Sequence, residues 1–362
     1  MRYVDEFRNQ KLVQKVAQEI KRIAPKNRPI NLMEVCGTHT QGFFRFGLKD
    51  LIPDSVHLLS GPGCPVCVSG QDYMDQAIEL SQRKNVIIAT FGDMMRVPGN
   101  SSSLEKERSK GAKVWVVYST LDALRVAEDN PTKRIVFLGV GFETTSPTIA
   151  IAIKEARKKD LGNFSVLVSH KLIPPAMKVI SQDKKLNIQG FLCPGHVSAI
   201  IGSEPYEFIA KKYRLPCVIA GFEPLDILEG IYMLLRQIKD KKSKVEIQYK
   251  RIVKPQGNPQ ARRILKEVFA VCDSNWRGLG IIPQSGLKIR GKYAQFDAQK
   301  VFKLKTALSK ETRGCICGLV LKGIKKPDDC HNFAVICTPE NPLGPCMVAS
   351  EGTCSIYYKY RK

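Results

Sequence analysis

Eight short apolar runs alternate with helical stretches along the first 220 residues of the chain, and Gly-rich turns join them. The runs lie at 30–35, 56–59, 86–90, 114–118, 135–139, 164–168, 188–192 and 216–220. Continuous apolar strands that alternate with helices are typical of a parallel sheet covered by helices on both faces. The sequence therefore predicts an α/β protein.

The polar stretch at 128–133 divides these runs into two series of four with similar lengths. We interpret the series as two similar parallel-sheet α/β domains, at 29–127 and 128–240, that face a cleft. A chain of 362 residues is long enough for two or three domains. Residues 1–28 are expected to form an N-terminal helix, amphipathic over 5–24, for which the third domain is one candidate packing surface.

The lysine-rich stretch at 240–244 is predicted to be a linker. Beyond it, a β-like stretch at 245–253 leads into a predicted helix at 259–272. Helical periodicity is weak after residue 310, so the end of the chain is expected to fold around something other than an apolar core. We interpret 241–362 as a third, small α+β domain.

The net charge of the chain is +23, from 57 Lys and Arg against 34 Asp and Glu. Such an excess raises nucleic acid as a partner. However, the basic residues are spread out and lack the aromatic interleaving of a single-strand-binding surface. The pattern favours a lysine-rich solvated surface, with an acidic protein partner as the second interpretation.

The apolar runs are all far shorter than a bilayer requires, and the first ten residues contain no apolar signal core. We therefore expect a cytoplasmic protein without membrane association. Grouped cysteines in that compartment are more often metal-binding or catalytic than disulfide-bonded.

Nine of the twelve cysteines fall in two tracts, and the C-terminal tract holds Cys315, Cys317, Cys330, Cys337, Cys346 and Cys354. Four of these six follow the spacing C-x14-C-x6-C-x16-C. Iron–sulfur clusters accept such wide and irregular spacing, whereas zinc ribbons prefer close C-x2-C pairs. The spacing favours an iron–sulfur cluster over zinc and over a set of free thiols, and it leaves open which four cysteines bind.

The N-terminal tract holds Cys36, in the motif CGTH at 36–39, and Cys64 and Cys67, in the motif GPGCPVC at 61–67. Each motif follows a predicted strand and precedes a helix, where α/β folds place their ligands. A C-x-x-C at a helix start favours thiolate and suits reversible disulfide formation. Cys36 and His39 could ligate a metal or form a Cys–His nucleophile, and His39 could also be an ordinary histidine at a helix start.

Three further loops follow predicted strands, at 139–145, 193–196 and 221–226. The first lacks the third glycine of a dinucleotide fingerprint. We expect these loops to meet in the cleft. Their polar residues Glu143, His196, Glu223 and Asp226 could be structural hydrogen-bonding groups or direct participants in the chemistry.

Together, CGTH at 36–39, GPGCPVC at 61–67, GFETT at 141–145, PGH at 194–196 and SEGTC at 350–354 resemble the HypD family of NiFe-hydrogenase maturation factors. The resemblance covers nearly the whole chain, and the spacing of the C-terminal cysteines agrees with it. The family more often has Ser and Ala where this chain has Ala349 and Thr353, a departure that leaves the cysteines unaffected.

The resemblance implies a scaffold that works with HypC in assembling the Fe(CN)2CO moiety of the hydrogenase active site. Such a scaffold is redox-active rather than a conventional turnover enzyme. It implies two similar α/β domains and a third domain with a 4Fe–4S cluster around a cleft. Cys36 would bind the transient iron that carries CN and CO, His39 would assist near that iron, and Cys64 and Cys67 would relay electrons from the cluster.

The implied cluster ligands are Cys315, Cys330, Cys337 and Cys354. The supporting residues of the cleft would be Thr38, Glu143, Thr144, His196, Glu223 and Asp226. The pattern assigns no role to Cys317 and Cys346.

The partners implied by the resemblance are HypC and HypE, which carries a thiocyanate group made with HypF. The chain would be a monomer within a HypC–HypD complex. One alternative is an iron–sulfur-dependent thiol–disulfide oxidoreductase acting on a protein disulfide, which would leave Cys36 and His39 without a task. Another is a metallochaperone that only carries iron.

Overall fold

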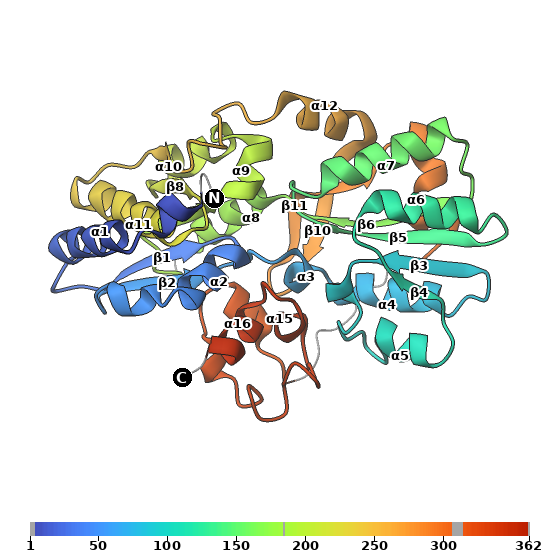
Figure 1. Cartoon of the computed structure of the whole chain (residues 1–362), viewed down its shortest axis with the longest axis horizontal. Helices are drawn as coiled ribbons and strands as arrows, with labels where there is room; N and C mark the ends of the chain where they lie inside the picture. Colours follow the sequence, from blue (N-terminus) through green and yellow to red (C-terminus); the bar gives the residue numbers. More distant parts are fainter. Residues whose placement is uncertain (1–3, 184, 306–313, 361–362) are drawn as a thin grey trace.

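The computed structural model describes residues 4–183, 185–305 and 314–360. In these ranges two parallel sheets lie side by side, and the C-terminal segment lies at their junction (Figure 1). The first sheet has the strand order β2-β1-β7-β8-β9, and the second has the order β4-β3-β5-β6. The predicted α/β class with parallel sheets is confirmed.

All eight predicted apolar runs coincide with strands, within two residues at most ends. The parallel strands are β1 (Ile30–Glu34), β2 (Val56–Ser60), β3 (Val86–Thr90), β4 (Val114–Val116), β5 (Arg134–Gly141), β6 (Phe164–His170), β7 (Gly190–Pro194), β8 (Cys217–Ala220) and β9 (Val245–Ile247). In β3, Val86 and Ile88 face one core cluster, whereas Ile87 and Ala89 face another. Burial on both faces is the reason why these strands are apolar along their whole length.

The strands are shared between the sheets differently from the expectation of one series for each sheet. β1 and β2 pair with β7, β8 and β9, whereas β3 and β4 pair with β5 and β6. The position 127/128 therefore falls within the stretch of chain that builds the second sheet. Strand periodicity is a local signal and does not report which strands pair, so this difference was not visible in the sequence.

Helices cover the sheets. The principal ones are α1 (Gln10–Ile23), α2 (Gly37–Arg45), α3 (Pro65–Val68), α4 (Gln71–Ser81), α5 (Leu104–Ser109), α6 (Thr120–Asp129), α7 (Ser146–Lys158), α8 (Ile173–Gln182), α9 (Gly195–Ile201), α10 (Glu207–Tyr213), α11 (Pro224–Lys239) and α12 (Pro259–Val268). One buried core cluster contains residues of both sheets, together with α4, α8 and the fully buried Trp276. The two sheets therefore share a core rather than forming two independent ones.

The N-terminal helix packs against the first sheet, whereas the third domain was the packing surface considered for it. After the short 3₁₀ helix η1 (Asp5–Arg8), α1 begins at the Asn9 cap, whose side chain accepts a hydrogen bond from Leu12 N at 3.2 Å. Its buried residues Val13, Ala17 and Ile20 belong to the core cluster formed by β1, β7, β8 and α11. The helix therefore completes the first sheet's layer.

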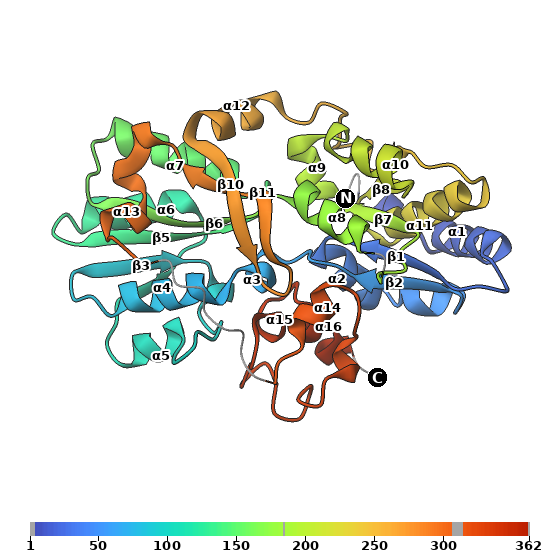
Figure 2. The same cartoon turned by 180° about the vertical axis from the view of Figure 1, so that it is seen from behind.

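The segment predicted as one helix over 259–272 ends as a helix at Val268. Residues beyond it belong to β10 (Phe269–Trp276), which pairs antiparallel with β11 (Gly280–Ile289). Cross-strand pairing with β11 outweighs the helical pattern here. The hairpin runs between the two sheets toward the C-terminal segment, as Figure 2 shows.

The expected third domain, 241–362, is spread over several parts of the molecule. β9 extends the first sheet, and the hairpin shares the core of the second sheet. The described residues from 314 onward form a segment of short helices: α14 (Cys317–Leu321), α15 (Pro345–Val348) and α16 (Thr353–Tyr360). Within the described ranges, the helices lack the combination of length and apolar character that a membrane crossing needs.

Candidate thiol centre

The two N-terminal cysteine loops lie against each other at the carboxyl end of the first sheet. Cys36 follows β1 and caps α2, whereas Cys64 follows the neighbouring strand β2 and caps α3. Gly37 N donates a hydrogen bond to Gly63 O at 3.0 Å. A Cβ atom at Gly63 would lie 2.4 Å from Cys36 N, so only glycine permits this approach.

Buried acidic groups surround Cys36. The residue is 8% exposed, and its N–H donates to Glu34 Oε2 at 2.9 Å. Burial, followed by the charge of Glu351, raises the pKa of the Cys36 thiol to about 12. Burial also raises the pKa of Glu34 to about 7, while Thr40 Oγ1 donates a hydrogen bond to this carboxyl. The Cys36 sulfur is therefore a protonated thiol until a cation binds it.

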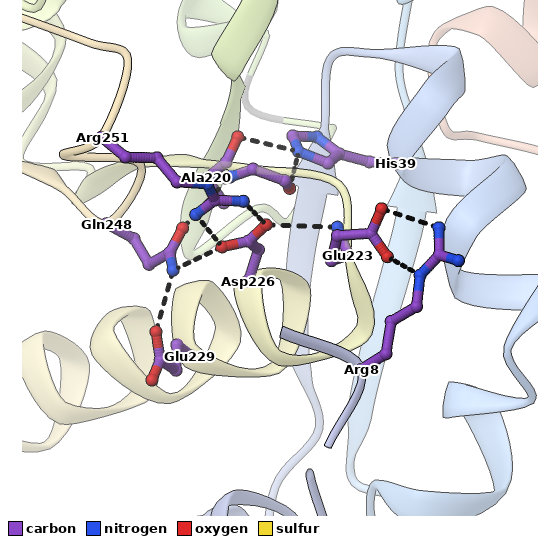
Figure 3. A network of polar contacts seen from close by, with 9 residues as sticks. Arg8, His39, Ala220, Glu223, Asp226, Glu229, Gln248 and Arg251 are labelled. Carbon is purple, nitrogen blue, oxygen red and sulfur yellow. Dashed lines mark hydrogen bonds and ion pairs between the residues drawn. The ribbon is translucent and has the colours of Figure 1, made fainter. Parts of the chain in front are cut away.

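His39 is fully buried one turn beyond Cys36. Its Nε2 lies 3.2 Å from Ala220 O and 3.0 Å from Gly221 O at the end of β8, so Nε2 carries the proton (Figure 3). Nδ1 has no hydrogen-bond partner among the described residues. Burial lowers the pKa of His39 to about 4, which keeps the ring neutral. The lone pair on Nδ1 is thus free to accept a hydrogen bond or bind a metal.

Phe222 joins two of the predicted histidines. His39 stacks on one side of its ring at 4.7 Å between centroids, and His196 stacks on it at 4.0 Å. The pKa of His196 is lowered by burial. The structure therefore brings the loops at 36–39, 193–196 and 221–226 together, with a phenylalanine that the motifs did not single out between them.

The C-terminal segment reaches the Cys36 loop through Glu351. Thr38 Oγ1 donates a hydrogen bond to Glu351 Oε1 at 2.5 Å. A Cβ atom at Gly37 would lie 2.2 Å from Glu351 O, so the two backbones are in direct contact. Thr38 therefore has a defined partner, and Glu351 is a site residue that lay unassigned in the SEGTC motif.

The two cysteine tracts meet in space. Cys67 N donates to Cys64 Sγ at 3.3 Å, and the Cys67 thiol hydrogen-bonds with Cys346. Cys346 in turn contacts Cys317, and Cys317 contacts Cys315. All twelve cysteines are free thiols. We call the series Cys64, Cys67, Cys346, Cys317 and Cys315 the thiol line; its third and fourth members, Cys346 and Cys317, are the cysteines without a predicted role.

The four cysteines expected to bind a cluster lie around the far end of this line. Cys337 lies near Cys315 and Cys354 and accepts a hydrogen bond from Leu343 N at 3.3 Å. Cys330 and Cys354 pack against the small apolar cluster that contains Cys337. These four thiols fit the donor set of an iron–sulfur cluster.

Within the described ranges, no three His, Cys, Asp or Glu side chains have the geometry of a site for a single metal ion. The ligands of a four-iron cluster each bind a different iron, so they stand further apart than the ligands of one ion.

Glu143 has a structural partner. Its Oε1 accepts a hydrogen bond from Ile173 N at 3.0 Å, the first residue of α8. Pro174 and Pro175 follow without N–H groups, so the carboxylate caps the one donor that precedes them. Burial raises the pKa of Glu143 to about 7. Thr144 lies partly exposed in the same loop, between β5 and α7.

Asp226 and Glu223 anchor the start of α11 (Figure 3). Asp226 is fully buried; it forms an ion pair with Arg251, with contacts of 2.7 and 2.5 Å, and accepts a hydrogen bond from Gln248 Nε2 at 2.9 Å. Glu223 pairs with Arg8, and its N–H donates to Asp226 Oδ2 at 3.2 Å. The contacts of both carboxylates are structural and tie the N-terminus to the end of β8.

Two signals could have identified the residues that the motifs did not single out. Glu34 is a carboxylate between the apolar residues Met33 and Val35 at the end of β1, which indicates a buried polar group with a special partner. The excess of six cysteines over four cluster positions indicates that the remaining two thiols have another use. Phe222 carried no comparable signal.

The comparisons with known proteins agree over almost the whole chain. The model of the HypD family, described as "Hydrogenase formation hypA family", matches residues 11–361. The chain is 45% identical to the hydrogenase maturation factor HypD2 of Bradyrhizobium diazoefficiens, covering 99% of this chain and 97% of that protein.

Two further relatives carry the same description. The chain is 46% identical to the hydrogenase maturation factor HypD of Rhizobium leguminosarum bv. viciae, covering 99% of this chain and 96% of that protein. It is 42% identical to the hydrogenase maturation factor HypD of Escherichia coli K12, covering 100% of this chain and 99% of that protein.

Proposed function

Because the chain belongs to the HypD family of hydrogenase maturation factors, we propose that it is the scaffold on which, together with HypC, the Fe(CN)2CO moiety of a NiFe-hydrogenase is assembled. Iron is the cargo of this scaffold, and Cys36 is its ligand. His39, with its unpartnered Nδ1, lies one turn away and serves as a neutral acceptor or ligand near the iron.

The observation that carries this proposal is the contact between the two cysteine tracts. The loop with Cys64 and Cys67 touches the Cys36 backbone on one side and Cys346 on the other. The thiol line therefore connects the cargo position with the four C-terminal thiols that would hold a 4Fe–4S cluster. When bound, such a cluster supplies electrons one at a time.

The thiols near Cys36 meet the electron requirement of cyanide transfer. Release of cyanide from a thiocyanate breaks the S–C bond, and the sulfur leaves with an electron pair and a proton. Oxidation of Cys64 and Cys67 to a disulfide releases two electrons and two protons. One thiocyanate and one dithiol thus give one thiol, one disulfide, one cyanide ion and one proton. Return of the disulfide to the dithiol takes up two electrons and two protons, and a bound cluster would pass on these electrons from an external low-potential electron donor.

The buried Cys36 thiol suits a cargo that arrives as a cation. Its raised pKa means that iron binding releases the thiol proton, and a carboxylate lies within hydrogen-bond distance of the same residue. Thiolate is a soft ligand suited to low-valent iron with diatomic ligands. We further propose that HypE donates the thiocyanate group. The chain itself would be a monomer within the HypC–HypD complex and would be located in the cytoplasm.

A second candidate function is thiol–disulfide exchange with a partner protein. The thiol line favours it, because a cluster and a C-x-x-C pair are sufficient for that reaction. It leaves Cys36 and His39 without a function, although Cys36 lies against the loop that carries Cys64. Infrared spectroscopy separates the two, since an exchange protein carries no CN or CO ligands.

The test uses the full chain purified with HypC. The wild type is expected to show CN and CO stretching bands and the visible absorption of an iron–sulfur cluster. Cys36→Ala is expected to lose the stretching bands and keep the cluster absorption, because Cys36 binds only the cargo. Cys330→Ala is expected to lose most of the cluster absorption.

Cys272→Ala is the matched control, because Cys272 is a partly exposed thiol in the hairpin, outside the thiol line. It is expected to retain both signals. Retention of the CN and CO bands in Cys36→Ala would contradict the assignment of Cys36 as the ligand of the iron. An unchanged visible spectrum in Cys330→Ala would exclude Cys330 from the ligand set.

A further inference from the structure

Arg277 is a buried cation at the tip of the hairpin. It follows Trp276 at the end of β10, and only 4% of its surface is exposed. Its backbone N–H donates to Val68 O at 2.9 Å, and its Nε donates to Ser69 O at 3.2 Å. The guanidinium therefore lies against the end of α3, the helix that carries Cys67.

The same hairpin tip touches the C-terminal thiols. Gly278 has φ of +78°, and a Cβ atom built on it would lie 2.4 Å from Gly318 Cα. Gly318 directly follows Cys317 in α14. The turn that carries Arg277 thus contacts both α3, which carries Cys67, and α14, which carries Cys317.

Among the residues that the structure describes, no carboxylate pairs with the charge of Arg277. Nη2 donates to the Gln71 side-chain oxygen at 2.8 Å, and the other acceptors of its donors among the described residues are backbone carbonyls. None of the ion pairs in the described ranges includes this residue. A guanidinium does not lose its proton in proteins, and a buried cation without an anion is costly.

The neighbouring thiols are the groups that can supply the missing negative charge. Arg277 directly precedes Gly278, whose backbone contacts Gly318 beside Cys317, so its charge acts on both Cys317 and Cys315. The hydrogen bond with Cys317 and burial raise the pKa of Cys315, and the contact with Cys346 and burial outweigh the lowering effect of Cys315 on the pKa of Cys317, so both thiols are neutral without a metal. Binding of a cluster would convert Cys315 to a thiolate. Arg277 therefore favours negative charge on the centre formed by the C-terminal cysteines.

We propose that Arg277 is the counter-charge of this centre and that it raises the reduction potential of the iron–sulfur cluster bound there. This inference rests on the proposed function. Reduction adds one electron from a low-potential one-electron donor, and no bond at Arg277 forms or breaks. A fixed cation in a low-dielectric site stabilises the more negative, reduced form. Arg277 is a positioning residue that acts through the centre.

Two substitutions test the charge in independent ways. Arg277→Gln removes the cation and keeps a hydrogen-bond donor. Gln71→Glu leaves Arg277 in place and sets a carboxylate at the 2.8 Å contact, which neutralises the cation locally. Arg277→Lys retains the charge. Arg290→Gln is the matched control, because Arg290 is exposed at the other end of the hairpin and donates to backbone carbonyls of Lys266 and Phe269.

The measurement is a potentiometric titration of the cluster in the full chain, with dithionite as reductant and electron paramagnetic resonance as the readout. Arg277→Gln and Gln71→Glu are each expected to lower the equilibrium constant for reduction about tenfold, which is about 59 mV for a one-electron couple. Arg277→Lys and Arg290→Gln are expected to remain near the wild-type potential.

Three outcomes overturn the inference. Unchanged potentials in both Arg277→Gln and Gln71→Glu would show that the charge has no effect on the centre. An equal fall in Arg277→Lys and Arg277→Gln would show that the side chain is only a structural tether. If Arg277→Gln does not fold, as judged by circular dichroism, the reduction potential of Gln71→Glu alone tests the inference. Absence of a cluster in the wild type would contradict the proposed function as well as the inference. Unchanged potentials in a protein that holds the cluster would contradict only the role of Arg277.

Discussion

Burial shifts the titratable side chains at the site toward their neutral forms. The pKa values of Cys36 and Glu34 are raised and that of His39 is lowered, and burial is the largest cause in each case. The Cys36 and Glu34 protons at this site are therefore ones that the proposed iron would displace. At this scale the sequence singled out the cysteines and His39, because their residue types report their chemistry directly, and their roles stay predictions.

Other residues at the same scale were beyond sequence reasoning. Arg277 and Glu351 are ordinary charged residues in the sequence, and their importance comes from burial beside thiols and from backbone contact with the Cys36 loop. Asp226 and Glu223 looked equally suited to chemistry or to structure. Their ion pairs with Arg251 and Arg8 show a structural use that spacing does not encode.

His170 is predicted to make stability pH-dependent. It is buried, both ring nitrogens lack partners among the described residues, and burial lowers its pKa from 6.5 to about 3. Between those values the unfolded chain binds a proton that the folded chain does not. The free energy of unfolding should therefore fall as the pH drops below 6.5, by about 1.4 kcal/mol for each pH unit from this residue.

His170→Phe removes the titration while keeping an aromatic ring against Phe269. Urea unfolding at pH 5.5 and 6.5 should show a smaller loss of stability in this variant than in the wild type. The difference between the two proteins isolates His170 from the opposite contribution of Glu143, whose raised pKa favours the folded state at lower pH. Equal losses in both proteins would contradict the prediction.

At the scale of elements, contact between loops decides the position of Cys36. The strands β1 and β2 are neighbours with a parallel register, so the loops that follow them leave the sheet side by side. The sequence predicted both strands and both following helices. It predicted the hairpin poorly, since the residues of β10 continue a helical pattern until pairing with β11 separates them.

Gly63→Ala is predicted to destabilise the protein through this loop contact. The new methyl group would lie 2.4 Å from Cys36 N and 2.5 Å from Cys36 Cα, so the backbone must shift. We expect a loss of about 1–3 kcal/mol in the free energy of unfolding, the usual cost of overpacking. Chemical denaturation measures it.

Gly162→Ala is the control, because no atom lies within 4 Å of a Cβ at that position. Its effect should stay within about 0.5 kcal/mol. Similar stabilities of the two variants would show that the Cys36 and Cys64 loops are not held in close contact.

At the scale of the whole molecule, the two sheets depend on segments distant in the chain. The first sheet takes two strands from the N-terminal third and three from residues after 189, and one core cluster extends across both sheets. The C-terminal segment then completes the thiol centre by contact with α2 and α3. The strand pairing therefore does not divide the molecule into an N-terminal and a central domain, each built from its own strand series.

A fragment of residues 1–127 is therefore predicted not to fold alone. Its strands β1 and β2 lack β7, and β3 lacks β5. We expect no cooperative thermal transition in circular dichroism, in contrast to the full chain. Coexpressed fragments 1–127 and 128–362 should associate, because each sheet contains strands from both. A cooperative transition of the isolated fragment 1–127 would contradict this view.

The sequence by itself determined the local structure and the inventory of reactive groups. Apolar runs, caps and glycine turns depend on neighbouring residues, so all eight predicted strands and the positions of Cys36, Cys64 and Cys67 after strands could be read from them. Only the tertiary structure decided which strands share a sheet, that Cys67 meets Cys346, and that Arg277 lies buried between α3 and α14. These contacts join residues far apart in the chain, and the burial that gives them their energy exists only after the chain has folded.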